Sequence, residues 1–278
     1  MLECVVNLSE GTERVRLDAF RDACGPVLLD LHTDRWHNRS VFTLAGPDEA
    51  LHGALRRLTT RAVELLDLGG HDGVHPRLGV VDVVPFVDLD GPPHATAASL
   101  AGRDRYAAWA SVEMGLPCFL YGPERTLPEI RRAAWRTLGP DLGPDRPHPS
   151  AGAVCVGARG PLVAFNLVLD RPDLVAARAA AAAVRGRDLR ALGLAVGPDV
   201  QVSCNLTSPH RLGPDAAFDA VAAVLARGGP AAPRIRRAEL VGLVPAAVLD
   251  RVPPARWPEL DLGPDRTIEA ALARAGGG

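Results

Sequence analysis

The sequence predicts an α+β protein made of two halves that meet near Arg159. Short β-branched and leucine-rich runs alternate with longer segments in which apolar residues recur every three or four positions. These are the patterns of buried strands and amphipathic helices. The chain has 278 residues, 47% of them hydrophobic, which suffices for one large core or two modest ones. A stretch rich in Gly, Pro and Asp at 138–152 cannot form a regular element and marks a boundary or a binding loop.

The first half is expected to contain strands and helices in alternation. The apolar runs that predict strands lie at 2–8, 27–31, 41–44, 78–86 and 117–121. Helices are expected at 12–24, 47–65, 95–114 and 127–135. The helix at 47–65 has the clearest pattern, because Leu51, Leu55, Leu58 and Ala62 recur at helical spacing. The stretch at 32–39 is too hydrophilic for a core and is predicted to be a loop.

The second half repeats this alternation. Strands are expected at 164–169, 200–205 and 238–244, and helices at 172–185, 215–227 and 267–274. The tripeptide Gly-Pro-Asp recurs along the chain, but at irregular spacing, so it indicates turns and helix starts and not a solenoid. Asp82 falls inside a buried strand, where an unpaired carboxylate is costly. We therefore expect it to pair with an arginine or with backbone N–H groups.

Composition excludes several kinds of function. The formal net charge is −2 and no apolar run approaches the length of a bilayer span, so neither nucleic-acid nor membrane binding is expected. All 31 basic residues are arginine, which excludes a lysine Schiff base and a lysine-bearing P-loop. The N-terminus lacks the basic start and cleavage site of a signal peptide, so a cytoplasmic location is expected. The five cysteines form no CxxC pair, which predicts reduced, mostly buried thiols.

The segment His71–Gly79, HDGVHPRLG, is the strongest candidate for chemistry. It joins the clearest helix to a buried strand, so it is expected to be a loop at a sheet edge. Two histidines four residues apart bind a metal when a helix presents both on one face, but Gly73 and Pro76 favour a loop. Acid–base work by a histidine is the better interpretation. Arg77 is suited either to a substrate carboxylate or to a surface ion pair.

The chain resembles the formiminotransferase domain of the formiminotransferase-cyclodeaminase family. The segments that carry the resemblance occur in the family's order from Glu3 to about Glu269, and they are ECVVNLSEG, NRSVFTLAG, HDGVHPRLGVVDVVPF, CFLYG, PSAGAVCVGARGPLVAFNLVL, VQVSCNL and AELVGLVP. The His-Pro-Arg block and the Gly-Ala-Arg…Ala-Phe-Asn block are specific in combination. No segment is left over for the separate cyclodeaminase domain that some members carry.

The resemblance implies a fold and an activity. The fold would be two ferredoxin-like α/β subdomains with mixed sheets and a ligand tunnel between them, at 1–158 and 159–278, in a homodimer. The activity would be transfer of a formimino group from N-formimino-L-glutamate to N5 of tetrahydrofolate, a step of one-carbon metabolism and histidine catabolism. Tetrahydrofolate would be a co-substrate, and no metal is implied.

The resemblance also assigns residues. The family's catalytic histidine falls on His75. Its folate-binding loop falls on Gly143 to Gly152, which includes Gly143, Pro144, Asp145, His148, Pro149, Ser150, Ala151 and Gly152. Further candidates for substrate binding lie in or near the matching segments, and they are Asn7, Glu10, His32, Asn38, Arg39, Arg77, Arg159 and Asn205. For Glu10 a turn-capping role, and for Arg159 a structural salt bridge, are equally consistent with the sequence.

The chain departs from the family's pattern at the expected site. His32 stands where the family has an acidic residue, and Asp34 lies close by as a possible replacement. Asp72 and Val74 replace a lysine and a glutamate beside His75, and Ala151 replaces a tryptophan in the folate loop. The scaffold therefore matches better than the donor site.

Three functions remain open on the sequence. The first is folate-dependent imino transfer, from formiminoglutamate or from a different amine or amidine in a biosynthetic pathway. The second is a folate-binding paralogue without catalysis, which the change at His32 suggests. The third is a metal-dependent hydrolase that uses His32, His37, His71 and His75.

Overall fold

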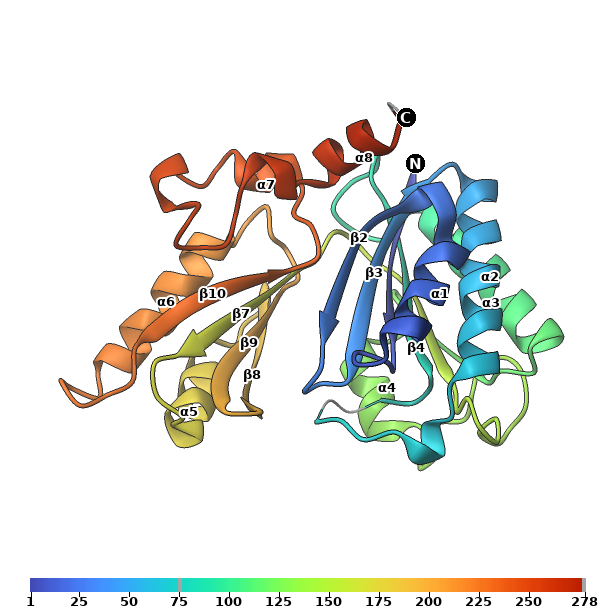
Figure 1. Cartoon of the computed structure of the whole chain (residues 1–278), viewed down its shortest axis with the longest axis horizontal. Coiled ribbons are helices and arrows are strands. Elements are labelled where there is room, and N and C mark those ends of the chain that lie inside the picture. Colours follow the sequence, from blue (N-terminus) through green and yellow to red (C-terminus); the bar gives the residue numbers. More distant parts are fainter. Residues whose placement is uncertain (75–76, 277–278) are drawn as a thin grey trace. The chain divides into compact units, whose positions relative to one another are not determined.

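The structure is a computed structural model that describes residues 1–74 and 77–276. The chain divides into two compact units, Met1–Gly160 and Pro161–Gly278. Each unit has its own sheet and its own helices (Figure 1). Among the described residues, none of the helices combines the length and the apolar character needed to cross a lipid bilayer.

The first unit contains a six-stranded sheet in the order β2-β3-β1-β4-β6-β5. Strands β1 to β4 pair antiparallel, whereas β4, β6 and β5 run parallel. Its elements in chain order are β1 (Leu2–Leu8), α1 (Arg14–Cys24), β2 (Leu28–Asp34), β3 (Arg39–Gly46), α2 (Asp48–Leu65), β4 (Val81–Asp88), α3 (Ala97–Glu113), β5 (Cys118–Tyr121), α4 (Leu127–Ala133) and β6 (Val154–Ala158).

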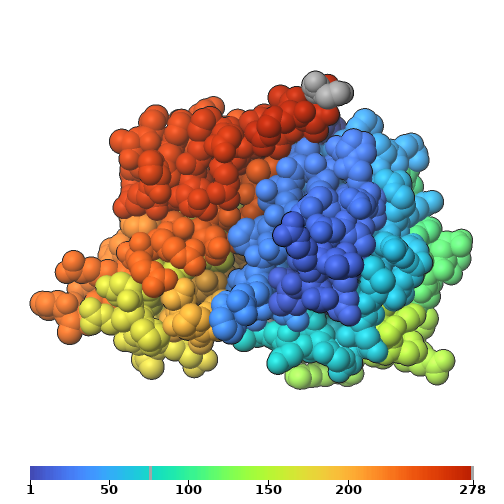
Figure 2. Space-filling model, viewed as in Figure 1, coloured from blue at the N-terminus to red at the C-terminus, as the bar shows by residue number. Residues whose placement is uncertain are grey.

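The second unit contains a four-stranded antiparallel sheet in the order β10-β7-β9-β8. Its elements are β7 (Val163–Leu169), α5 (Leu174–Val184), β8 (Leu189–Val196), β9 (Asp199–Leu206), α6 (Pro214–Ala226), β10 (Ile235–Val241), α7 (Ala246–Leu249) and α8 (Ile268–Gly276). The segment after β10 packs Val244, Val248 and Leu260 into the core of this unit, and Figure 2 shows it as a continuous orange-to-red layer.

Both units contain the same βαββαβ motif. In the first unit β1-α1-β2-β3-α2-β4 gives the strand order β2-β3-β1-β4, and in the second β7-α5-β8-β9-α6-β10 gives the equivalent order β8-β9-β7-β10. This is the ferredoxin-like arrangement. The predicted α+β class with two similar subdomains is therefore confirmed.

Strands β6 and β8 are not expected from the sequence, and the loop between β2 and β3 is shorter than expected. Strand β6 has only five residues and contains Gly157, and β8 places apolar Leu192 and Ala195 at exposed positions, so its sequence lacks a clear polar–apolar alternation. The polar stretch 32–39 is not all loop: β2 continues to Asp34 and β3 begins at Arg39. The polar side chains there are accommodated because cross-strand pairing satisfies the backbone whatever the side chains are.

The helices α1, α2 and α3 cover one face of the first sheet. Their apolar stripes meet the alternate β1 residues Leu2, Cys4, Val6 and Leu8 in a single buried cluster. The residues between them, Val5 and Asn7 among others, lie on the opposite face. All five cysteines are buried and unpaired, as expected from their spacing.

Asp82 is paired, as the sequence predicts. It is 3% exposed, and its Oδ1 accepts hydrogen bonds from the Leu78 backbone at 2.7 Å and from Arg131 Nη1 at 2.9 Å. Arg131 also donates to Oδ2 through Nη2. This bidentate ion pair ties α4 to β4 and fixes the residues that lead into β4.

His52 on α2 is a histidine buried against an aromatic ring. Its ring stacks on Phe86 with centroids 5.3 Å apart, and both ring nitrogens are buried without a hydrogen bond. Burial, with Arg105 acting in the same direction, lowers the pKa of His52 to about 4. The folded state therefore favours the neutral imidazole.

We expect Asp82→Ala to destabilise the protein strongly. The change leaves the Arg131 guanidinium without its carboxylate and the Leu78 N–H without an acceptor, which costs about 3–5 kcal/mol for a buried pair broken on one side. The measurement is the free energy of unfolding in urea. Asp18→Ala is the matched control, because Asp18 pairs with Arg21 on the exposed side of α1 and such pairs contribute about 0–1 kcal/mol. Equal losses in the two variants would contradict the role given to Asp82.

We expect His52 to make the protein sensitive to acid. Its pKa is depressed in the folded state, so its contribution to stability is complete above the unfolded value of about 6.5 and is lost as pH falls toward about 4. Between about pH 7.5 and pH 5 the wild type should lose about 2 kcal/mol more than His52→Leu. Denaturant unfolding of both proteins at each pH measures this difference. Parallel losses would show that other groups cause the acid sensitivity.

Candidate functional site

The candidate site lies at one end of the first sheet. The register pairs Leu8 with Ser40 and with Val81, and it pairs Asp34 with Arg39. This pairing places three segments at the same end: 7–11 after β1, the turn 35–38 between β2 and β3, and 71–80 before β4. We call this region the site end.

Asn38 joins the three segments. It adopts a left-handed backbone conformation with φ of 45°, which asparagine tolerates better than most residues. Its Oδ1 accepts from the Gly11 backbone at 3.0 Å, and its Nδ2 donates to the Asp72 carbonyl at 2.9 Å. One side chain thus crosslinks the end of β1 and the segment 71–80 to the turn that carries it.

The predicted catalytic residue His75 and its neighbour Pro76 lie outside the described residues. The residues on either side of them are bonded to the turn 35–38. The Val74 backbone donates to the Trp36 carbonyl at 3.5 Å, and Arg77 donates to the His37 carbonyl at 3.0 Å and to the Asn38 carbonyl at 3.3 Å. A Cβ on Gly73 would lie 2.4 Å from the His37 carbonyl, so only glycine permits this approach.

The end of the predicted folate loop lies beside the same segment. The Val80 backbone donates to the Ala151 carbonyl at 3.0 Å, and the Ala153 backbone donates to the Leu78 carbonyl at 2.8 Å. Gly152 has φ of 72°, and a Cβ there would lie 2.2 Å from the Leu78 carbonyl. The backbone at 150–153 therefore runs directly along the backbone at 78–80, just after the His-Pro-Arg block.

Within the folate loop the residues divide by exposure. Gly143, Pro144, Asp145 and Pro149 are exposed, whereas the Ala151 side chain is buried in the core. His148 Nδ1 accepts from the Ala151 backbone at 3.1 Å, and the Ser150 carbonyl accepts from Leu68 at 2.7 Å. The loop is thus anchored at its C-terminal end and open to solvent along 143–147.

Three arginines gather at the site end. Arg39 lies at the start of β3, and burial lowers its pKa, with Arg131 and Arg77 acting in the same direction while Asp82 and Asp34 oppose them. Arg77 is partly buried in the same surroundings. Asp82 is engaged by Arg131, and the carboxylates of Asp34 and Asp72 also lie near the guanidinium groups of Arg39 and Arg77.

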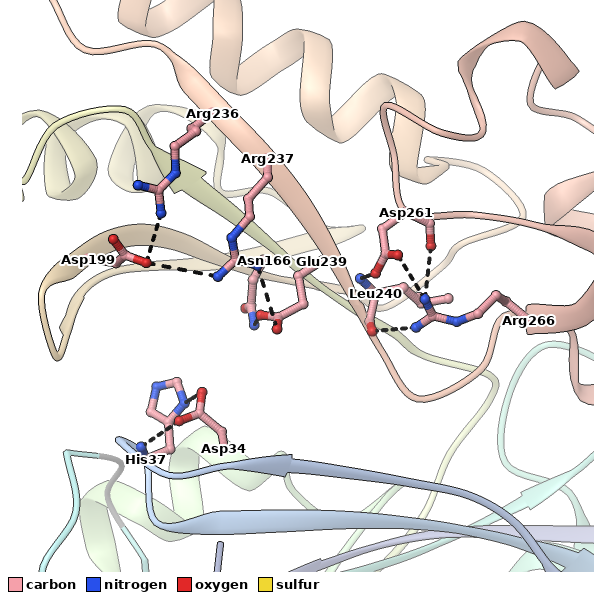
Figure 3. Close-up of polar contacts among 10 residues, drawn as sticks. All are labelled: Asp34, His37, Asn166, Asp199, Arg236, Arg237, Glu239, Leu240, Asp261 and Arg266. Atoms are coloured by element: carbon pink, nitrogen blue, oxygen red, sulfur yellow. Dashed lines mark hydrogen bonds and ion pairs between the residues drawn. The ribbon is translucent and has the colours of Figure 1, made fainter. Parts of the chain in front are cut away.

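Asp34 and His37 form a carboxylate–imidazole pair on the turn between β2 and β3 (Figure 3). Asp34 Oδ2 lies 2.9 Å from His37 Nδ1, and Oδ1 accepts from the backbone N–H groups of Trp36 and His37. Although partial burial raises it, these hydrogen bonds hold the pKa of Asp34 well below its usual range. The sequence analysis named Asp34 only as a replacement for the acid lost at position 32. The Asp-x-x-His spacing across a turn was the signal for the pair.

Other predicted residues have structural partners. Glu10 closes the turn that leads into α1: its Oε1 accepts from the Thr12 and Glu13 backbones at 2.8 and 3.0 Å, and its Oε2 accepts from Arg16 at 3.0 Å. Asn7 Nδ2 donates to the Val5 carbonyl at 3.3 Å. His71 is partly buried, and burial lowers its pKa with help from Arg77.

The remaining candidates lie elsewhere. His32 is on β2, opposite Val41 in the register and on the face away from α1. Arg159 follows β6 and bonds through its backbone to Phe86, near the end of β4 that is remote from the site end. Asn205 is exposed on β9 of the second unit. On the same face of that sheet Asn166 donates to Glu239 at 3.1 Å (Figure 3).

A metal site was the basis of one alternative function. Within 1–74 and 77–276 there is no group of three or more His, Cys, Asp or Glu side chains placed to hold a metal ion. The predicted set of four histidines includes His75, which is outside these ranges.

The comparisons with known proteins agree with the resemblance. Residues 1–159 match the family described as the formiminotransferase domain, N-terminal subdomain. The chain is 32% identical over 275 residues to glutamate formimidoyltransferase of Streptococcus pyogenes serotype M1, covering 90% of each protein. It is 32% identical over 281 residues to the protein of the same name from Thermoplasma acidophilum, covering 90% of this chain and 89% of that protein.

A second group of relatives is matched over part of their length. The chain is 36% identical over 189 residues to formimidoyltransferase-cyclodeaminase of Mus musculus, covering 61% of this chain but 34% of that longer protein. Two relatives are thus matched over nearly their whole length, and the family model covers more than half of this chain. The chain belongs to the formiminotransferase family and is a formimidoyltransferase.

Proposed function

We propose that this enzyme transfers the formimino group of N-formimino-L-glutamate to N5 of tetrahydrofolate, with His75 as the proton-handling residue. The products are 5-formiminotetrahydrofolate and glutamate. The first unit supplies His75 and the folate loop, and Arg39, Arg77 and Asn38 shape the donor site. Tetrahydrofolate acts as a co-substrate.

The observation that carries the proposal is the pairing of 150–153 with 78–80. The segment assigned to folate binding and the segment assigned to catalysis come from distant parts of the sequence. Their backbones are nevertheless hydrogen bonded to each other. A transferase needs this arrangement, because holding two substrates in one geometry supplies much of the rate enhancement of a bimolecular reaction.

The residue types fit the chemistry. Attack by N5 on the amidine carbon gives a tetrahedral adduct, and the attacking nitrogen must lose a proton. His75 accepts that proton and returns one to the departing glutamate nitrogen, which is work suited to an imidazole near neutral pH. Such proton transfers typically contribute about 10²–10⁴-fold in rate.

The charge of the site fits the donor. Formiminoglutamate carries two carboxylates, and a guanidinium group binds a carboxylate through two parallel hydrogen bonds. Arg39 and Arg77 lie at the site end, and Nε of Arg39 is buried without a hydrogen-bond partner among the described residues. We assign Arg39 to a donor carboxylate.

The test is turnover by purified protein. Wild type is mixed with tetrahydrofolate and N-formimino-L-glutamate, and 5-formiminotetrahydrofolate is followed by absorbance and mass. We expect turnover by wild type and a loss of at least about 10²-fold in kcat for His75→Ala. His94→Ala is the matched control, because His94 is exposed and follows the other end of β4. Tetrahydrofolate binding without turnover by wild type would refute the proposed reaction.

A further inference from the structure

The outer edge of β10 is a feature of the second unit that the proposed reaction leaves unused. β10 lies at one end of the strand order of its sheet and pairs with β7. A strand in this position presents a row of N–H and C=O groups to any strand that approaches, so sheet edges are common sites of pairing between chains. Proteins that keep their sheets separate cover or interrupt such edges.

Two side chains bind the backbone of Leu240 at this edge (Figure 3). Asp261 Oδ2 accepts from the Leu240 N–H at 2.9 Å, and Arg266 Nη2 donates to the Leu240 carbonyl at 2.9 Å. Arg266 Nη1 also donates to Asp261 Oδ1 at 2.8 Å, so the two side chains bind each other as well. In an antiparallel sheet a neighbouring strand bonds the N–H and the C=O of one residue in the same way. The carboxylate and the guanidinium thus take the place of a further strand at Leu240.

The segment that follows β10 holds this pair in place. Asp261 has φ of 54°, a left-handed conformation that aspartate tolerates, and it lies between Leu260 and Leu262, which are both buried in the core of the second unit. The Arg266 carbonyl accepts from the Val244 backbone at 3.1 Å. Both charged side chains are therefore presented to β10 from backbone that is itself anchored.

The pair blocks much of the regular edge of β10. Since backbone groups alternate in direction along a strand, the residue before Leu240 whose groups also point outward is Ala238. The register shifts between Ile235 and Arg237, which ends the regular stretch on that side. A strand that added to this edge would need the groups of both Ala238 and Leu240, and those of Leu240 are engaged.

The sequence of β10 indicates which strand would fit the edge. Two copies of β10 paired antiparallel, with Ala238 opposite Ala238, place Arg237 of each copy opposite Glu239 of the other. Opposite charges directly across two strands stabilise their pairing. Arg237 and Glu239 lie 3.8 Å apart within one chain, so the symmetric arrangement replaces one ion pair by two equivalent pairs between copies.

We propose that the Asp261–Arg266 pair closes the edge of β10 against strand addition, and that the partner it excludes is β10 of a second copy of this chain. The pair occupies the position where an added strand would lie and binds the same backbone groups. The two arrangements therefore exclude each other. Removing the pair exposes an edge whose charge pattern is complementary to itself.

The experiment compares the self-association of wild type and of the double variant Asp261→Gly/Arg266→Ala by sedimentation velocity, between about 1 and 100 µM. Glycine keeps the left-handed backbone at position 261 and removes the carboxylate. The average mass of the double variant should rise with concentration toward twice that of the wild type. Arg266→Ala alone keeps Asp261 on the Leu240 N–H and should show a smaller rise. Thermal unfolding shows whether each variant is folded, and the single variant decides the matter if the double variant is not.

The matched control is Asp219→Ala/Arg256→Ala, which removes an exposed Asp–Arg pair of the same unit that does not bind β10, and whose mass should equal that of the wild type. Adding Arg237→Glu to the opened edge places like charges across the two strands and should abolish the association.

An unchanged mass in the folded variants at every concentration would refute the closing role of the Asp261–Arg266 pair. Association that persists after Arg237→Glu is added would refute β10 of a second copy as the partner. The readout is mass, so the result is independent of the formimino transfer proposed above.

Discussion

The buried ion pair between Asp82 and Arg131 is the interaction on which the candidate site depends. It fixes the Leu78 backbone through the same carboxylate oxygen that binds the guanidinium. Leu78 in turn accepts from Ala153, and the next residues pair with 151–152. The start of β4, the end of the predicted folate loop and helix α4 are thus connected through one carboxylate. A hydrophobic replacement could fill this space, but it would not position Leu78.

Several other charged groups at the site end are also engaged. Asp82 is paired with Arg131, Asp34 is hydrogen bonded to His37, and Glu10 is bonded to the turn before α1 and to Arg16. Arg39 and Arg77 lie at the same end of the sheet, and the exposed carboxylate of Asp72 lies near Arg77. The guanidinium groups of Arg39 and Arg77 have the geometry to bind a carboxylate, a group that both formiminoglutamate and folate possess.

The fold could be predicted from the sequence largely because the helices and most strands are strongly periodic. Helix α2 and strand β1 were placed within a residue or two, since their buried faces recur at 3.6 and 2 residues. Strands β6 and β8 were not predicted because β6 is a short run that contains glycine, and β8 has apolar residues at exposed positions that hide its alternation. Asp82 could be predicted to have a partner, but Arg131 lies 49 residues away and nothing local identified it.

The site was predictable only in part, for a related reason. The contact between 150–153 and 78–80 is a tertiary pairing that no local pattern encodes, and it places together two segments that resemblance had assigned separately. Arg159 was also a candidate for substrate binding from the sequence. It follows β6 and bonds to Phe86, toward the end of β4 that is remote from the site end. The Asp-x-x-His spacing of Asp34 and His37 is visible in the sequence. The tight turn that brings the two side chains together is evident only from the structure.

The turn between β2 and β3 is held to its neighbours by groups other than the side chain of residue 37. The contacts are made by the backbone carbonyls of residues 36–38, the Asn38 amide and the Arg77 guanidinium. Any amino acid at position 37 would present the same carbonyl to Arg77. The side chain there can therefore change while Val74 and Arg77 stay bonded to the same carbonyl groups. Substitution at this position can thus alter the surface chemistry of this end of the sheet without a change of scaffold.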